Sequence, residues 1–115
     1  MGIEEINGYL REQLWMDFEA TKIGANILEL HGYIDESCND CILIRFRDVY
    51  AVNITTKFSY EGKGDFISII DGNRAYTLNS EYEAPIGYRI FRLLRTNIPT
   101  EMFIIANNIE LEVIT

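Results

Sequence analysis

The chain has 115 residues, of which 48% are hydrophobic and 24% charged, and 14 are tyrosine, phenylalanine or tryptophan. This size suits a single domain over residues 1–115, and this composition excludes an intrinsically disordered chain. The net charge of −8 opposes binding to nucleic acid and to anionic lipid surfaces. No apolar run reaches the roughly 18 residues of a membrane-spanning helix, and the first residues lack the layout of a signal peptide. We therefore expect a soluble, cytoplasmic protein that binds neither nucleic acid nor membrane.

The negative charge is concentrated in the first third of the chain. Residues 1–40 hold nine acidic and two basic side chains, whereas acids and bases nearly balance in the remainder. A surface of this sign keeps a domain soluble, and it also speeds the encounter with a positively charged molecule. The charge distribution is thus compatible with a basic protein partner.

A short amphipathic helix is predicted at the start of the chain. The apolar residues Ile3, Ile6, Tyr9, Leu10 and Leu14 recur at the three- and four-residue spacings of one helical face. Gly8 lies within this segment and costs about 1 kcal/mol of helix stability relative to alanine.

From Met16 onward the hydrophobic period changes to two, which is typical of half-buried β-strands. The alternating apolar positions are Met16, Phe18 and Ala20, then Leu28 and Leu30, then Ile42, Ile44 and Phe46. A bend at Asp48 resets the register before the alternation resumes at residues 50–54.

The next segments combine turn residues with short apolar runs. Turns are predicted at residues 61–64 and at residues 71–73, because glycine and asparagine tolerate a positive φ. The second turn is expected to join strands at 65–70 and 75–78 in a hairpin. Residues 102–106 and 109–114 are expected to form a further hairpin around Asn107 and Asn108.

Residues 85–99 fit two structures. With Pro85 at its first position and Asn97 and Pro99 as stop signals, the segment can form a helix. Its tyrosine, isoleucine and phenylalanine residues equally suit a strand that turns and pairs with residues 102–106. The strand is favoured because strands that follow one another in sequence usually pair.

The predicted fold is mainly β: an antiparallel sandwich or a partly open barrel with a short N-terminal helix. The alternative is an α+β fold with a further helix at about 86–96.

Cys38 and Cys41 form a C-x-x-C pair. A redox pair of this type requires a helix N-terminus to lower the thiol pKa, but here the pair leads into an alternating, strand-like segment. The nearby acids Asp35, Glu36 and Asp40 disfavour thiolate formation. The sequence therefore favours two free thiols over a catalytic dithiol.

A metal site is only weakly indicated. His31, Cys38 and Cys41 are the candidate ligands, whereas structural zinc normally takes four cysteine or histidine ligands. His31 follows Leu28 and Leu30 on the opposite strand face, which places its imidazole near solvent. No metal or other cofactor is predicted.

Acidic residues two positions apart occur three times, as Asp17 with Glu19, Glu81 with Glu83, and Glu110 with Glu112. Such spacing places both carboxylates on one strand face, which suits acid–base chemistry but is also typical of a solvated sheet face. The chain contains no catalytic or phosphate-binding motif, and no catalytic residue is predicted.

The sequence is therefore interpreted as that of a non-catalytic protein-binding module, with Asp35, Glu36 and Asp40 as the candidate partner-binding residues. One alternative is an immunity-type inhibitor, a small acidic domain that covers the surface of a basic toxin or enzyme. The other is a β-domain that binds a small ligand in an aromatic pocket.

Overall fold

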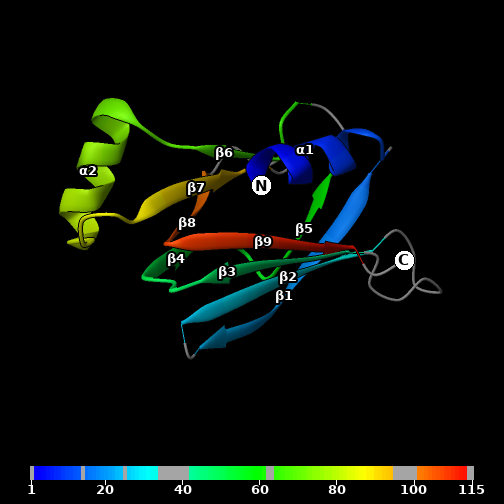
Figure 1. Ribbon diagram of the computed structural model, residues 1–115, viewed down its shortest axis with the longest axis horizontal. Helices are drawn as coiled ribbons and strands as arrows, with labels where there is room; N and C mark the ends of the chain where they lie inside the picture. The colour runs from blue at the N-terminus through cyan, green and yellow to red at the C-terminus, as the bar shows by residue number, and fades with distance from the viewer. Residues whose placement is uncertain are drawn as a thin grey trace.

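The computed structural model describes residues 2–13, 15–24, 26–33, 42–61, 64–94 and 101–113. Within these ranges the chain forms two helices and nine strands (Figure 1). In chain order they are α1 (Ile3–Arg11), β1 (Met16–Gly24), β2 (Ile27–Tyr33), β3 (Ile42–Arg47), β4 (Ala51–Asn53), β5 (Lys57–Tyr60), β6 (Ile67–Ile69), α2 (Gly72–Tyr82), β7 (Arg89–Leu93), β8 (Met102–Ala106) and β9 (Asn108–Val113).

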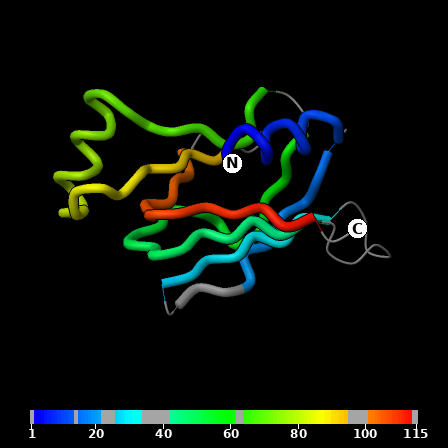
Figure 2. Tube along the Cα trace, viewed as in Figure 1, coloured from blue at the N-terminus to red at the C-terminus, as the bar shows by residue number. Residues whose placement is uncertain are grey.

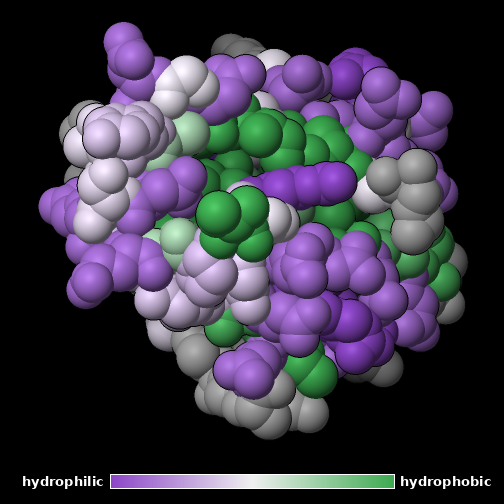
Figure 3. All heavy atoms as spheres, turned by 60° about the vertical axis from the view of Figure 1, so that its left-hand side comes forward, coloured by the Kyte–Doolittle hydropathy of each residue, from purple (hydrophilic) through white to green (hydrophobic). Residues whose placement is uncertain are grey.

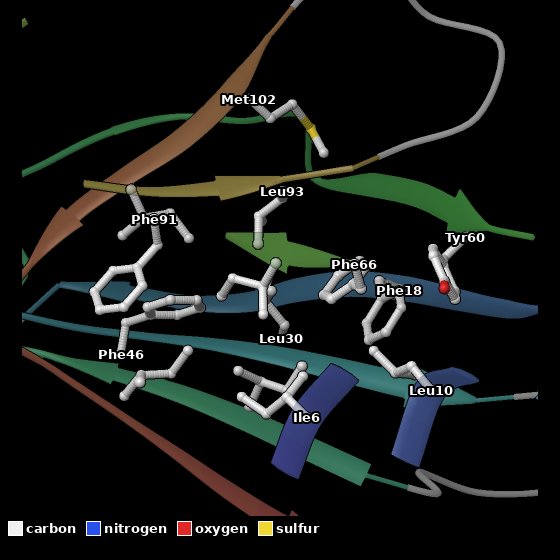
Figure 4. Packing of buried hydrophobic residues seen from close by; sticks show 14 of the residues in the cluster. Ile6, Leu10, Phe18, Leu30, Phe46, Tyr60, Phe66, Phe91, Leu93 and Met102 are labelled. Carbon is white, nitrogen blue, oxygen red and sulfur yellow. The ribbon is translucent and has the colours of Figure 1, made fainter. Parts of the chain in front are cut away.

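The strands form two open antiparallel sheets. A five-stranded sheet has the order β5-β1-β2-β3-β9, and a four-stranded sheet has the order β4-β8-β7-β6. Both sheets contribute to one hydrophobic core, to which α1 adds Ile6 and Leu10 (Figure 4). The prediction of a mainly β fold with an N-terminal helix is confirmed.

The period-two pattern places the predicted residues in this core. Phe18, Leu30 and Ile44 come from three neighbouring strands and are at most 1% exposed. Phe46 of the five-stranded sheet meets Phe91 of the four-stranded sheet edge to face, with ring centroids 5.5 Å apart. The bend expected before β4 is also found, because Asp48 adopts a positive φ of 55°.

The four-stranded sheet is covered on both faces. Its inner face packs on the five-stranded sheet, and its outer face holds a second cluster of buried residues that includes Leu78 of α2 and Phe103 of β8. Every residue of β8 is therefore buried, which explains the uninterrupted apolar run of residues 102–106.

The predicted hairpin of residues 102–106 with 109–114 is wrong. β8 pairs with β4 and β7, whereas β9 pairs with β3 in the other sheet. Figure 2 shows the sharp change of direction between the two strands. Asn107 lies at this bend, and its N–H donates to the carbonyl oxygen of Arg47 over 3.2 Å. The asparagine pair thus marks a crossing between sheets.

The predicted turn at residues 71–73 and strand at 75–78 are also wrong. Residues 65–70 do contain a strand, β6, but Asp71 is extended and lies at the N-terminal end of α2. The segment forms a helix because Ala75, Leu78 and Tyr82, three and four residues apart, pack together on the outer face of the four-stranded sheet.

The segment with two possible structures is a strand where it is described. β7 spans Arg89–Leu93 and pairs antiparallel with β8, as the favoured interpretation predicted. The alternative helix at about 86–96 is wrong for residues 86–94. Residues 95–100 lie outside the described part of the chain.

Candidate interaction surface

His31 is the one metal candidate that lies in the described part of the chain. Its Nε2 is 3.7 Å from Oε1 of Glu29, and both side chains are about one-fifth exposed on the outer face of the five-stranded sheet. The described residues contain no group of three or more histidine, cysteine or acidic residues placed to hold a metal ion. The other predicted site residues lie outside the described ranges: Asp35, Glu36, Cys38, Asp40 and Cys41.

The outer face of the five-stranded sheet carries an ion-pair network. Glu29, Arg45 and Glu110 lie side by side across β2, β3 and β9. Arg45 Nε is 2.9 Å from Glu29 Oε2 and its Nη1 is 3.5 Å from Glu110 Oε1, while Arg47 Nε donates to the same Glu110 oxygen over 3.0 Å.

This network shifts the pKa values of its members. The hydrogen bond to Glu29 raises the pKa of Arg45 above its usual value, although desolvation acts to lower it. The hydrogen bond from Arg47 holds the pKa of the Glu110 carboxyl below its usual range. Glu110 is thus held ionised by arginines, whereas a general acid requires a raised pKa.

The other two pairs of acidic residues lie on β1 and at the C-terminal end of α2. On β1, Asp17 accepts a hydrogen bond from the Ser59 hydroxyl over 2.6 Å. Glu19 lies 3.9 Å from the Lys57 ammonium group, and both are well exposed. Glu81 lies in α2 and Glu83 at its C-terminal cap, so this pair does not share a strand face.

Among the described residues, the two most exposed large hydrophobic side chains belong to Tyr76 of α2 and to Ile86 in the segment that follows it, and α2 forms one end of the molecule (Figure 1). Helix α2 is anchored by Leu78 and by an ion pair of 2.7 Å between Arg74 and Glu101. It ends at Glu83, whose φ of 54° is left-handed, and the chain then returns to β7 through residues 84–88.

We use the name α2 end for Tyr76 of α2, for Glu83, Ile86 and Tyr88 in the segment that follows it, and for Tyr50, which contacts this segment. Ile86 is fully exposed, Tyr76 is 75% exposed and Tyr50 is 44% exposed. The Tyr50 ring contacts the ring of Tyr88 edge to face, and its hydroxyl donates to the carbonyl oxygen of Glu83 over 2.9 Å. Figure 3 turns this end toward the reader and shows hydrophobic side chains exposed among hydrophilic ones.

Exposed tyrosines next to an exposed aliphatic side chain are typical of protein-binding surfaces. A tyrosine ring contributes a large contact area for few rotatable bonds, and its hydroxyl can hydrogen-bond across an interface. The sequence did not predict this surface, because residues 75–78 were expected to form one strand of a hairpin. The available signal was the spacing of Tyr76, Tyr82 and Tyr88, six residues apart around a proline and a glycine.

The space between the two sheets is filled by side chains. Phe18 stacks on Phe66 with a centroid separation of 4.7 Å and on Phe58 with a separation of 5.4 Å. Tyr60 meets Phe66 edge to face. These aromatic side chains thus pack on one another and form part of the core between the two sheets.

Comparison of the chain with models of protein families finds no match, and comparisons with curated proteins and with solved structures find none either. In the described part of the chain, neither helix has the length and apolar character needed to cross a membrane.

Proposed function

We propose that this chain is a non-catalytic protein-binding module that contacts its partner through the α2 end. The observation that carries the proposal is the exposure of three large side chains at this end of the molecule: Ile86 is fully exposed, Tyr76 is 75% exposed and Tyr50 is 44% exposed. Removing an aliphatic or aromatic side chain from water contributes about 1.5–3 kcal/mol. A partner that covered Ile86 would gain this contribution, and it would gain less from Tyr50, of which only 44% is exposed; such central anchors dominate the binding energy of an interface.

The proposed partner is a basic protein. The net charge of −8 attracts a positively charged molecule over a distance of about one Debye length. Glu83, whose carbonyl oxygen accepts the hydrogen bond from Tyr50, is exposed, and so is Glu81 of α2. Charge of this kind increases the association rate more than the affinity. The immunity-type inhibitor is the form of this proposal in which the basic partner is a toxin or an enzyme.

Affinity capture from native cell extract tests the proposal. The immobilised chain should retain a protein at low salt, and the retained amount should fall as salt is added. Ile86→Asp and Tyr76→Asp should each reduce retention about tenfold, because each places a charge in an apolar contact.

Val113→Asp is the matched control, because Val113 is 49% exposed and lies in β9, which ends on the side of the molecule away from α2 (Figure 1). This variant should retain the same protein as the unmodified chain. Equal retention by all four chains, or no retained protein at low salt, would contradict the proposal.

A further inference from the structure

Helix α1 runs along the free edge of the four-stranded sheet, where β6 is the last strand. Arg11 pairs with Asp65 at 2.7 Å, Asn7 contacts Ile67, and Ile3 lines the same groove as Ile69. Four helical residues rise about 6.0 Å and two strand residues about 6.8 Å. Positions 11, 7 and 3 of the helix therefore come level with positions 65, 67 and 69 of the strand.

Asn7 takes the place of a neighbouring strand at one of these levels. Its side-chain amide donates to the carbonyl oxygen of Ile67 over 2.8 Å, and its Oδ1 accepts from the Ile67 N–H over 2.9 Å. Asn7 is only 6% exposed, so both hydrogen bonds are buried. The edge of β6 is thus closed at Ile67.

The edge is open at the next level. Leu94 N–H donates to the carbonyl oxygen of Phe66, and Ile70 N–H donates to that of Ile90, so the backbone groups of Phe66 and Ile70 point toward β7. Because the backbone groups of an antiparallel strand point alternately to its two sides, the N–H and carbonyl oxygen of Ile69 point away from β7. Ile3 lies at this level and has an aliphatic side chain, which cannot take the role of Asn7. Among the described residues, no group bonds to the N–H or carbonyl oxygen of Ile69.

The open edge continues through Asp71. This residue is extended, with φ −135° and ψ −174°, and alternation directs its N–H to the same side as that of Ile69. No described residue accepts a hydrogen bond from it. The N–H groups of Ile69 and Asp71 and the carbonyl oxygen of Ile69 are therefore available to hydrogen-bond with another polypeptide segment.

The groove beside this edge has the volume and charge for an extended peptide. Its volume is about 580 Å³, with Ile3 and Ile69 as apolar lining and Ile69 41% exposed. Three charged residues line the groove: Arg11 and Asp65 pair with each other, whereas Glu4 is exposed and has no ion-pair partner among the described residues. Asp71 adds a second exposed carboxylate at the end of β6.

We infer that this groove binds an extended, basic segment of a partner protein, which adds as a strand beside Ile69–Asp71. Open backbone N–H and carbonyl groups in register are complementary to another polypeptide backbone. An apolar side chain of the segment packs on Ile3 and Ile69, and a lysine or arginine pairs with Glu4 or Asp71. The groove is separate from the α2 end, and its occupancy does not depend on what the α2 end binds.

Selection of short linear peptides from a random phage-displayed library on the full chain tests this inference. We expect enrichment of peptides that alternate β-branched and basic residues. Ile69→Pro removes the open N–H and leaves the hydrogen bonds of Phe66 and Ile70 to β7 in place, since proline is tolerated where the N–H of an edge strand faces outward. Fluorescence anisotropy of an enriched peptide should show about tenfold weaker binding to this variant.

Glu4→Lys provides a test that does not perturb the strand. It should weaken the same peptide about tenfold, while Glu12→Lys, at the exposed C-terminal cap of α1, should leave binding unchanged. Amide hydrogen exchange at Ile69 should slow when the peptide binds.

Three results would overturn the inference. The first is no enrichment of basic peptides, and the second is equal peptide affinity for the unmodified chain, Ile69→Pro and Glu4→Lys. The third is a concentration-dependent dimer of the unmodified chain that Ile69→Pro abolishes, because a second copy of the chain would then occupy the edge.

Discussion

Asn7→Ala removes the side chain that closes the edge of β6. The two hydrogen bonds to Ile67, of 2.8 and 2.9 Å, are lost together, and two backbone groups lose their partners. Each buried group left unsatisfied costs about 1–3 kcal/mol. Water from the adjoining groove can reach part of this site, so we expect the free energy of unfolding to fall by about 3 kcal/mol.

Urea denaturation followed by circular dichroism measures this change. The denaturation midpoint should fall with little change in the m-value, because the core residues stay buried in the folded state. Asn73→Ala is the matched control: Asn73 is exposed on α2, and its replacement should change stability by no more than about 0.5 kcal/mol. A loss below about 1 kcal/mol in Asn7→Ala would refute the account of a strand-replacing amide.

Asn7→Asp separates the hydrogen bonds from the volume of the side chain. Near neutral pH its carboxylate would face the carbonyl oxygen of Ile67, so burial and repulsion should raise the folded-state pKa above the unfolded value of about 3.9. A group with a raised folded-state pKa contributes stability below the unfolded pKa and loses it as pH rises through the folded value. The stability deficit of Asn7→Asp should therefore increase from acidic to neutral pH, while that of Asn7→Ala should not.

Further predictions concern two glycines, one ion pair and the attachment of α2. Gly32→Ala would place a Cβ 2.7–2.9 Å from three core side chains; denaturation should show a loss of about 1–3 kcal/mol. Gly8→Ala meets nothing within 4 Å and should gain up to about 1 kcal/mol, so a loss there would contradict the helix geometry. The hydrogen bond from Arg47 lowers the pKa of Glu110, so its stabilisation is present above the unfolded pKa and disappears as pH falls through the folded value; Glu110→Gln should reduce the acid sensitivity of unfolding, and an unchanged pH profile would contradict this. Leu78→Ala removes the one buried side chain described in α2 and should speed chymotrypsin cleavage at the α2 tyrosines, whereas equal cleavage rates would mean that Leu78 does not anchor the helix.

Sequence patterns were sufficient to predict the secondary structure where one face of a segment is buried and the other faces solvent. Met16 and Phe18 of β1 alternate with acids, and the structure buries both. The same holds for Ile6 and Leu10 in α1, whose spacing already predicted a helix. In each case the local period records the environment directly, because every second or every third to fourth side chain meets the core.

The two candidate binding surfaces could not be predicted from hydrophobic periodicity. Tyr50 meets Tyr88 and the backbone of Glu83 only because α2 and the segment that follows it pack on the outer face of the four-stranded sheet. The open edge at Ile69 depends on α1, some 60 residues earlier in the chain. Asn7 of this helix hydrogen-bonds the backbone of Ile67, whereas Ile3, beside Ile69, has no polar group to do the same. Neither arrangement produces a periodic signal in the sequence.

The amino-acid sequence by itself determined the strand faces of β1, β2 and β3, the N-terminal helix and the acidic charge. Only the tertiary structure decided that β8 and β9 belong to different sheets and that residues 72–82 form a helix. Hydrophobic periodicity states that a side chain is buried but not which element buries it. The pairing of β8 with β7 and of β9 with β3, like the covering of β8 by α2, is set by contacts between residues distant in the sequence.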